Sequence, residues 1–404
     1  MPVSSRFRDY YQFAHPTRVV AGRGMIEGVG FEFTKEGARR PLIVSDEVVR
    51  GTGLVEKAEA GVADGGLEVA GVFDDVHQDS STSTVEACAA AAKETGADSF
   101  LAVGGGSVMD TAKVANVVFT HGGAVLDYEG LYTLPREDDG LGAPQPVAPL
   151  ACIPTTAGTG SEVSMGAVIK DPEQEIKLLI GDFPMFPRLA ILDPESTRTL
   201  PPQIAAATGM DAMTHAIEAY TTPEWSPHGE AFCLQALRMI RDNLPVAVED
   251  PSDEDARGSM LVAASLAIVP GAAATSALGA VHSMSHPAGA HNGVPHGVAN
   301  SINLPHVIRF NCGGGPEIAD RYREIAVLMG AESGGSDEEV GDSLASWVSE
   351  LTTRIGLPQR LSEVGVSEAD IPVLVEGAMG DGCSLTNARE LVDEDFEALY
   401  KQAL

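Results

Sequence analysis

The sequence from Ser99 to Val114 reads Ser-Phe-Leu-Ala-Val-Gly-Gly-Gly-Ser-Val-Met-Asp-Thr-Ala-Lys-Val, an apolar run, a glycine turn and a helical pattern in succession. Strand, glycine turn and helix in this order are typical of nucleotide-binding βαβ units. Glycines allow positive φ and close backbone approach, and the free N–H groups at a helix start bind phosphate. The stretch therefore predicts a parallel sheet with a phosphate loop at Gly105, Gly106 and Ser107, although a plain tight turn is the alternative.

The rest of the chain divides into a strand-and-helix part and a helical part. Apolar runs recur at residues 41–45, 147–153, 166–169 and 189–192, and residues 84–95 form an Ala-rich helical pattern. Strands separated by helices imply a parallel sheet. Beyond Ser196 a 3.6-residue periodicity dominates, at residues 230–243, 255–268, 317–329 and 342–355. We predict an α/β parallel-sheet domain over residues 1–194 and an all-α domain over residues 195–404.

The composition of the chain indicates which classes of molecule it can bind. The chain has 404 residues with 58 acidic and 26 basic side chains, a net charge of −32. This charge repels phosphate backbones and anionic lipid, so we expect no nucleic acid and no membrane partner, but a small molecule. Only seven of the basic residues are lysine. Scarce lysine with abundant carboxylate resembles proteins of halophilic organisms, an ordinary acidic cytosolic protein being the alternative.

Location is predicted from three features. The five cysteines are scattered and never form C-x-x-C, so neither a disulfide framework nor a thiolate metal site is implied. Residues 1–11 carry charges without a following apolar run, which argues against a secretory signal and favours the cytoplasm. Residues 261–281 are uncharged but rich in Ala, Gly and Ser and interrupted by Pro270, so we expect a buried core helix or helix pair.

A second polar loop follows the strand that ends at Ile153. It reads Pro154-Thr-Thr-Ala-Gly-Thr-Gly-Ser-Glu162, and its hydroxyls and glycines suit phosphates or a carboxamide. Two such loops after successive strands suggest a dinucleotide at the strand ends. Asp46 directly follows the run 41–45, where a carboxylate accepts hydrogen bonds from a ribose diol and repels a 2′-phosphate, which favours NAD over NADP. A helix N-cap is the alternative for Asp46.

Histidines gather where a metal site is expected. Asp211 and His215 are four residues apart, on one face of a predicted helix. Four of the ten histidines then fall within fifteen residues, at His282, His286, His291 and His296. Imidazoles with a carboxylate and no cysteine suit Zn²⁺ or Fe²⁺ in a catalytic site with one open position. Spacing alone does not decide which histidines bind, and His282 with His286 is the simplest pair.

These motifs together resemble the iron-containing (group III) alcohol dehydrogenases. The resemblance rests on the glycine loop with Asp110 and Lys113, the loop 154–162, Gly209-Met-Asp-Ala-Met-Thr-His-Ala-Ile-Glu-Ala-Tyr220, and His282-Ser-Met-Ser-His-Pro287 with Pro295-His-Gly-Val-Ala-Asn300. It covers most of the chain. It implies a Rossmann-like N-terminal domain, a helical C-terminal domain, and a cleft between them for NAD(P) and one divalent metal.

Site residues follow from the resemblance by position. The metal ligands it implies are Asp211, His215, His282 and His296, and His286 becomes a catalytic residue for positioning or proton relay. The cofactor residues it implies are Asp46, Gly105, Gly106, Ser107, Asp110, Thr155, Thr156, Thr159 and Lys177. Where relatives often have Asn-Pro near the adenine, this chain has Asp79-Ser80, and residues 270–275 replace an aromatic residue of some relatives, which suggests a roomier pocket.

The function expected is a metal-dependent, NAD(P)-linked alcohol dehydrogenase. A metal held by one carboxylate and three imidazoles keeps a positive charge that lowers the pKa of an alcohol or polarises an aldehyde, while hydride passes to or from nicotinamide. Primary alcohols or diols are the expected substrates, and a homodimer or larger assembly is expected from the family. The alternatives are a hydroxyacid-oxoacid transhydrogenase or a dehydroquinate synthase-like lyase with tightly bound NAD.

Overall fold

The computed structural model describes residues 11–137, 142–174, 176–223, 226–273 and 278–404, without the side chains of residues 272 and 273. Two predictions concern residues that lie largely or partly outside these ranges. The argument against a secretory signal rests on residues 1–11, and the suggestion of a roomier pocket rests on residues 270–275. The chain forms two compact units that divide after Ala14 and after Leu200. The expected boundary at residue 194 thus lies six residues before the observed one. Residues 11–14 belong with the helical unit, where Phe13 packs on Phe232 and His228.

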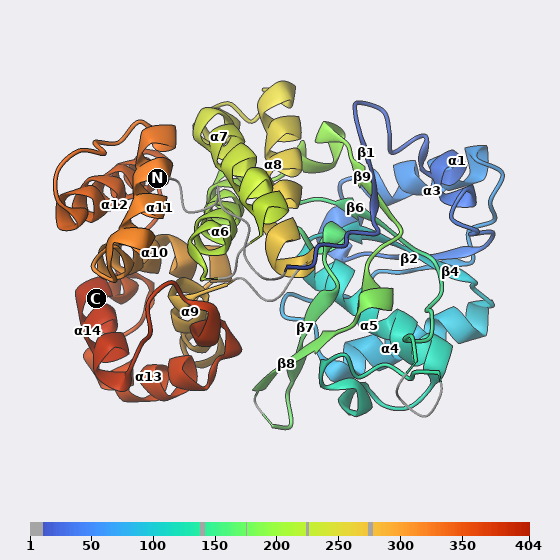
Figure 1. Cartoon of the computed structure of the whole chain (residues 1–404). Helices are drawn as coiled ribbons and strands as arrows, with labels where there is room; N and C mark the ends of the chain where they lie inside the picture. The colour runs from blue at the N-terminus through green and yellow to red at the C-terminus, as the bar shows by residue number, and fades with distance from the viewer. Residues whose placement is uncertain (1–10, 138–141, 175, 224–225, 274–277) are drawn as a thin grey trace. The chain divides into compact units, whose positions relative to one another are not determined.

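The unit from His15 to Leu200 is built on a six-stranded parallel sheet in the order β1-β9-β6-β4-β2-β3 (Figure 1). Its strands are β1 (Arg18–Ala21), β2 (Pro41–Val44), β3 (Gly71–Phe73), β4 (Ser99–Gly104), β6 (Leu150–Pro154) and β9 (Leu189–Leu192). In β2, β4, β6 and β9 every residue is buried, which explains why they read as continuous apolar runs. The register pairs Ala102 with Cys152 and Gly104 with Pro154, so both predicted loops begin at one edge of the sheet.

Helices cover both faces of this sheet. The helices are α1 (Val29–Thr34), α2 (Glu47–Arg50), α3 (Leu54–Asp64), α4 (Thr82–Thr95) and α5 (Gly106–His121). Alternate strand residues face opposite cores: Leu42 packs with the α4 and α5 side chains, whereas Ile43 packs with α1 and α3. The predicted helix at 84–95 is α4, which begins at the Ser81 cap and ends at Gly96 in the left-handed conformation.

A small second sheet lies in the same unit. It joins β5 (Gly130–Leu131), β8 (Ile176–Gly181) and β7 (Gly166–Asp171), with β7 and β8 antiparallel. The apolar run at 166–169 therefore belongs to a hairpin and not to the parallel sheet. The Asp110 carboxylate ties α5 to this hairpin, because its Oδ2 accepts a hydrogen bond from the Val168 backbone N–H at 2.9 Å.

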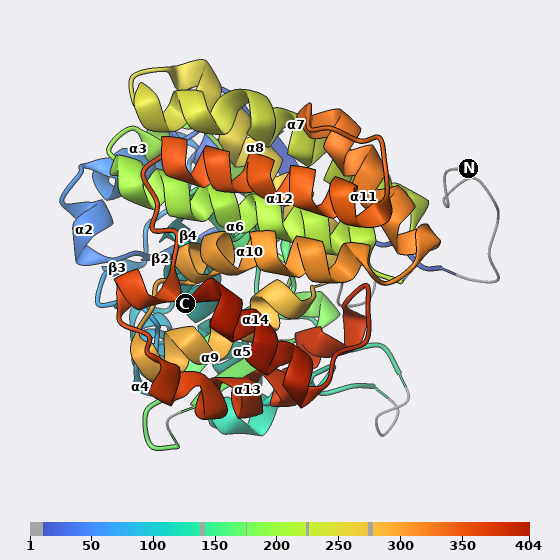
Figure 2. The same cartoon turned by 90° about the vertical axis from the view of Figure 1, so that its left-hand side faces the viewer.

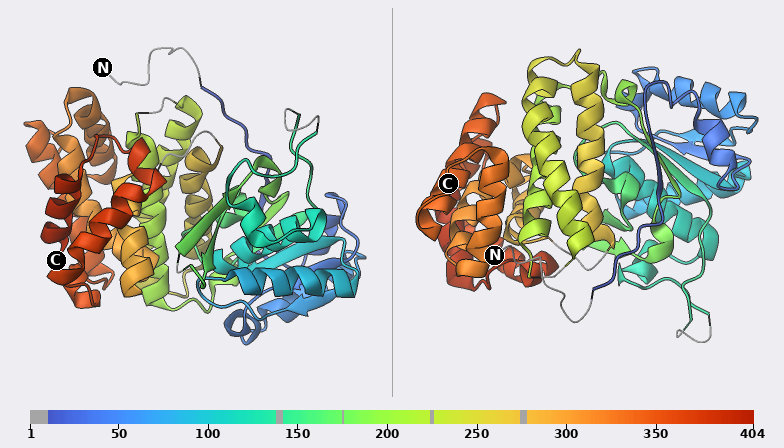
Figure 3. Two further views of the ribbon diagram at one scale, coloured as in Figure 1. Left: turned by 90° about the horizontal axis from the view of Figure 1, so that it is seen from below. Right: turned by 45° about the horizontal axis from the view of Figure 1, so that its top comes forward.

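Every regular element described beyond Leu200 is a helix. The α-helices are α6 (Pro202–Thr221), α7 (Pro227–Glu249), α8 (Glu254–Ala273), α9 (Ala280–Asn292), α10 (His296–Cys312), α11 (Pro316–Met329), α12 (Asp337–Arg354), α13 (Ile371–Gly380) and α14 (Asp393–Ala403). Helix α10 packs against both α6 and α12 (Figure 2), and Figure 3 shows the paired α7 and α8. The uncharged stretch 261–281 contributes to α8 and α9. In the described part of the chain, no helix meets the length and hydropathy needed to span a bilayer.

Candidate metal centre

Four side chains from three helices converge within the helical unit. Asp211 and His215 lie on α6, His282 lies on α9, and His296 is the first residue of α10. The Nε2 atoms of His215, His282 and His296 lie 3.7, 3.7 and 3.4 Å from Asp211 Oδ1. Ligands bound tetrahedrally at about 2.0–2.1 Å lie roughly 3.4 Å from one another, so the observed spacing fits a single Zn²⁺- or Fe²⁺-sized ion.

Burial leaves this cluster open on one side. The side chains of Asp211, His215 and His282 are 4%, 7% and 1% exposed, whereas His296 is 38% exposed. The imidazoles of His215 and His282 stack with centroids 4.8 Å apart. Solvent therefore reaches the cluster past His296, and an exogenous ligand, in addition to the four protein side chains, would enter from this side.

Glu218 orients one of the imidazoles. It lies on α6, three residues after His215, and its Oε2 is 2.5 Å from His282 Nδ1. Its other oxygen, Oε1, accepts the backbone N–H of Val281 at 2.7 Å. With Nδ1 donating to a carboxylate, the Nε2 lone pair of His282 is directed at the cluster, an arrangement seen around protein-bound metals.

Asn300 shows that the ligand atoms face one small volume. Its amide nitrogen lies 2.8 Å from Asp211 Oδ1, 3.2 Å from His296 Nε2 and 3.4 Å from His282 Nε2. Because these three acceptor atoms surround a single amide group, their lone pairs point toward the same small volume. Asn300 lies one turn after His296 on α10, so the same helix supplies a ligand and its neighbour.

The charges in the cluster follow from its contacts. Burial lowers the pKa of His282, but the nearby Glu218 and Asp211 carboxylates outweigh burial and raise this pKa to about 10. Burial also lowers the pKa of His215, to about 4. Burial raises the pKa of Asp211, yet the imidazoles of His215 and His296 hold it well below its usual range. Asp211 and His215 therefore already have the protonation states that metal binding requires, whereas His282 holds a proton that a metal ion must displace.

We expect Glu218→Gln to weaken metal binding about 10- to 100-fold, the usual loss when the partner of a ligating histidine is altered. A glutamine cannot accept from both Nδ1–H and the Val281 N–H as a charged group does. Competition with a chromophoric chelator measures the affinity. Glu230→Gln is a matched control, because Glu230 is also a buried carboxylate of this unit but pairs with Arg321; an equal loss in both variants would contradict an orienting role for Glu218.

His286 lies beside this cluster without joining it. It is on α9, one turn after His282, and its Nδ1 lies 2.7 Å from Asp381 Oδ2. Its ring stacks on that of His296 with centroids 5.3 Å apart. The structure thus groups His296, and not His286, with Asp211. Asp381 was not among the residues singled out from the sequence.

The candidate nucleotide loops lie at the edge of the parallel sheet. Gly105 precedes α5 without a side-chain cap, which leaves first-turn N–H groups for an anion. The backbone N–H of Thr155 bonds to Gly104 O at 3.0 Å, so the threonine loop is fixed beside the glycine loop. Thr156 Oγ1 is buried with no hydrogen-bond partner among the described residues, and a carboxamide or phosphate would supply one.

The other predicted cofactor residues have partners within the protein. Asp46 is the N-cap of α2, because its Oδ1 accepts a hydrogen bond from the Val49 N–H at 2.8 Å. The N-cap alternative for Asp46 is therefore confirmed, and its ribose contact stays a prediction. Asp110 accepts hydrogen bonds from Ser161 Oγ and the Val168 N–H through its two oxygens. Lys177 pairs with Asp79 at 2.9 Å. Asp110 therefore serves the internal structure of this unit, whatever else it contacts.

Gly106→Ala is expected to weaken nucleotide binding about 10- to 100-fold. A Cβ at this position would lie 2.9 Å from Thr159 Cγ2, so the Thr159 side chain would have to shift, and such overpacking typically costs about 1–3 kcal/mol. Fluorescence titration with NADH measures the affinity. Gly380→Ala, whose Cβ would meet open space, is the control. Unchanged affinity in the Gly106 variant would exclude this loop from the binding site.

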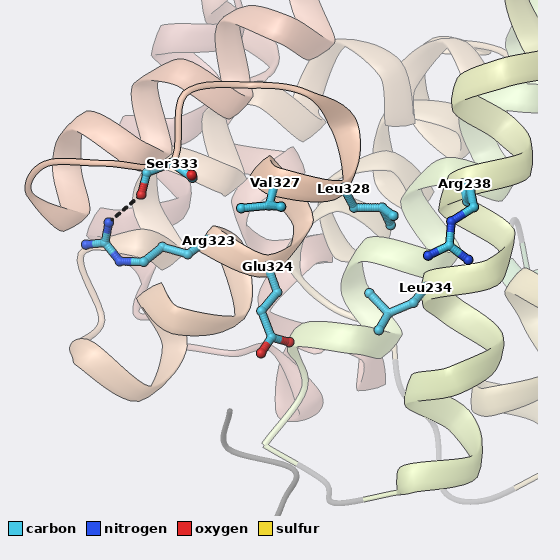
Figure 4. Close-up of a pocket in the computed structure, with 7 residues that line it drawn as sticks. All are labelled: Leu234, Arg238, Arg323, Glu324, Val327, Leu328 and Ser333. Carbon is cyan, nitrogen blue, oxygen red and sulfur yellow. Dashed lines mark hydrogen bonds between the residues drawn. The ribbon is translucent and has the colours of Figure 1, made fainter. Parts of the chain in front are cut away.

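A separate pocket of about 420 Å³ lies between α7 and α11 (Figure 4). Its walls include Leu234, Arg238, Val327 and Leu328, and Arg323 bonds to the Ser333 carbonyl at its end. None of the predicted metal or cofactor residues lines it. This pocket is therefore distinct from the cluster on α6, α9 and α10.

Comparison with known proteins identifies the family of this chain. A family model described as iron-containing alcohol dehydrogenase matches residues 16–194, and one described as the Fe-containing alcohol dehydrogenase family, C-terminal, matches residues 205–404. The NAD-dependent methanol dehydrogenase of Bacillus methanolicus is 36% identical over 393 residues, 97% of this chain and 99% of that protein. The 1,3-propanediol dehydrogenase of Klebsiella pneumoniae is 36% identical over 386 residues, 95% and 96% of the two chains.

A solved structure extends the likeness to three dimensions. The crystal structure of a 1,3-propanediol oxidoreductase superposes with a TM-score of 0.91 at 33% identity, covering 98% of this chain and 100% of that chain. The predicted fold class and resemblance are thereby confirmed. The chain belongs to the iron-containing alcohol dehydrogenase family and is an oxidoreductase that acts on alcohols.

Proposed function

We propose that this enzyme interconverts primary alcohols or diols and their aldehydes by hydride transfer to and from NAD, with one divalent metal held by Asp211, His215, His282 and His296. The observation that carries the proposal is the convergence of three imidazole nitrogens on one carboxylate oxygen, at 3.4–3.7 Å. The relatives named for NAD-dependent methanol and 1,3-propanediol dehydrogenases support the substrate class.

The donor set fits Fe²⁺ or Zn²⁺. One carboxylate with three neutral imidazoles contains no sulfur and leaves a net positive charge on a divalent ion. Such an ion supplies a Lewis acid that lowers the pKa of an alcohol and polarises a carbonyl. Zinc binds such sites more tightly than iron. Iron therefore occupies the site only where the supply of iron exceeds that of zinc.

The protein's own side chains orient the reacting groups and handle the proton. Glu218 holds the His282 ring, and Asn300 holds the Asp211 carboxylate. With Nδ1–H of His286 donated to Asp381, the Nε2 lone pair of His286 is free to accept the alcohol proton in the oxidation direction. Burial raises the pKa of Asp381, but the hydrogen bond from His286 outweighs burial, and the pKa of this carboxyl lies well below its usual range.

For the nucleotide, we propose that the start of α5 and the threonine loop bind the pyrophosphate and carboxamide. Two observations support this assignment: the first turn of α5 has no side-chain cap, and Thr156 Oγ1 has no hydrogen-bond partner in the part of the chain that the structure describes. Asp46 favours NAD, because its carboxylate suits a ribose diol and repels a 2′-phosphate. Lys177 is retained as a cofactor residue, and its pair with Asp79 would have to open or shift for it to reach a phosphate.

The test is the formation of NADH in molar KCl with a panel of primary alcohols and diols, using NAD and NADP in parallel. The metal-free enzyme should be inactive, and adding Zn²⁺ or Fe²⁺ should restore the rate. Absence of turnover with every alcohol, in protein that holds metal and nucleotide, would reject the proposal. Electron transfer from a hydroxyacid to an oxoacid by NAD that never dissociates would identify the transhydrogenase alternative.

We also propose that the enzyme assembles as a homodimer or a larger homo-oligomer, as the family resemblance implies. Light scattering coupled to size-exclusion chromatography, at low and molar salt, measures the mass. Salt matters because a charge of −32 on each chain opposes association unless it is screened. A mass of one chain at both salt concentrations would reject the proposed assembly.

A further inference from the structure

A second group of metal-binding side chains lies in the helical unit. His286 on α9, Asp381 and Cys383 each offer one donor atom, and these three atoms lie within 4.8 Å of one another. The same spacing holds for Asp211, His215 and His282 in the first cluster. The second group differs chemically, because it includes a thiol.

The group is held in place by its own backbone. Asp381 caps the 3₁₀ helix η9 (Gly382–Thr386), and its Oδ1 accepts the Cys383 backbone N–H at 2.8 Å. Its other oxygen lies 2.7 Å from His286 Nδ1. The carboxylate thus stands between the imidazole and the thiol, and the three donors keep their spacing without a ligand.

Access distinguishes Cys383 from the other cysteines. All five lie within the described residues; Cys88, Cys152, Cys233 and Cys312 are buried, and Cys383 is partly exposed. The His286 side chain is 32% exposed. A cation from solvent can therefore reach both a nitrogen and a sulfur donor here.

The donor types select the cation. Imidazole nitrogen, carboxylate oxygen and thiolate sulfur together suit Zn²⁺ and chemically similar ions, whereas Mg²⁺ and Ca²⁺ prefer oxygen alone. Burial and the Asp381 carboxylate raise the pKa of the Cys383 thiol, so without metal the sulfur keeps its proton. A cation must displace that proton, which makes this site weaker than one built from neutral imidazoles.

We propose that His286, Asp381 and Cys383 form a second, sulfur-containing site for a Zn²⁺-like cation, and that filling it inhibits the enzyme. On binding, the thiol proton is released to solvent and sulfur bonds to the cation. The cation also takes the place of the proton on His286 Nδ1, and that proton moves to Nε2. With this hydrogen on it, Nε2 of His286 no longer accepts the alcohol proton. The inhibition rests on the proposed function, whereas the binding does not.

Cobalt(II) is the probe, because a cobalt–thiolate bond gives an intense near-ultraviolet absorption that nitrogen and oxygen ligands do not. We expect metal-free protein to bind a first equivalent of Co²⁺ without this band and a second equivalent with it. Cys383→Ser should lose the band and the second equivalent, and Asp381→Asn should weaken both. Asp370→Asn is the matched control, because it removes an exposed His–Asp contact with His291 that includes no thiol.

The outcomes separate the two proposals. A single bound cobalt without the sulfur band, or a band that persists in Cys383→Ser, would overturn the second site. With the first cluster filled, excess Zn²⁺ should inhibit the wild type at concentrations at least tenfold lower than those needed for Cys383→Ser. Equal inhibition of both proteins would overturn the inhibitory role. A protein that shows the cobalt band but oxidises no alcohol would keep the site and reject the proposed function.

Discussion

His282→Ala should lose bound metal and turnover together while nucleotide affinity is retained. His282 is 1% exposed and its Nε2 lies 3.7 Å from Asp211 Oδ1, so the substitution removes one buried donor atom from the cluster. Altering only the partner of a ligating histidine costs about 10- to 100-fold in affinity, and removing the ligand should cost more. Because the ion supplies several kcal/mol of transition-state stabilisation, we expect kcat to fall by about 10³-fold or more.

Metal content by plasma emission spectrometry and NADH titration measure the two halves of this prediction. His291→Ala is the matched control, since His291 lies on the same helix, is 47% exposed and contacts Asp370. It should keep metal and activity. A His282→Ala protein that turns over alcohol without metal would contradict the assignment of the cluster, whereas parallel loss in both variants would indicate damage to α9.

Asp46→Ser should raise the ratio of kcat/KM for NADP over NAD by about 10- to 100-fold. A carboxylate beside a 2′-phosphate costs several kcal/mol, and removing it relieves this repulsion and loses a ribose contact. Serine also keeps the N-cap of α2, which Asp46 now provides to the Val49 N–H. The cofactor effect is therefore separated from stability.

Asp46→Ala is the informative comparison. It removes both the carboxylate and the cap, so it should show the same change in cofactor preference with an added loss of about 1 kcal/mol in the free energy of unfolding. Steady-state kinetics with both cofactors and denaturant titration give the two quantities. A serine variant that still rejects NADP would show that Asp46 acts only as a helix cap.

The parallel sheet could be predicted because its central strands are buried on both faces. Residues such as Leu42 and Ile43 point to opposite cores and are both apolar, which leaves a continuous run in the sequence. The edge strands β1 and β3 were not predicted. Strand β3 is only three residues long and all three are only partly buried, so the short apolar run that includes it does not stand out as a buried strand. The run at 166–169 could be recognised as a strand, but its sheet could not be predicted. The sheet depends on which strand it pairs with, and the composition of a strand does not specify its partner.

Around the metal cluster, local spacing explains what could be found. Glu218 lies three residues after His215 and seven after Asp211, so helical periodicity places it on their face and could have marked it. Asp381 is 95 residues from His286, and only the tertiary fold reveals their contact. Spacing also favoured His282 with His286 as a pair, whereas helix α10 brings His296 to Asp211.

Glu218 also connects the metal cluster with the start of helix α9. One of its oxygens serves the His282 ring and the other serves the first turn of α9, and a Cβ on Gly279 would lie 3.0 Å from the latter. A single residue thus holds both the first turn of α9 and the orientation of the His282 imidazole. A substitution of Glu218 that alters the metal cluster would therefore also alter the contact that holds the start of α9.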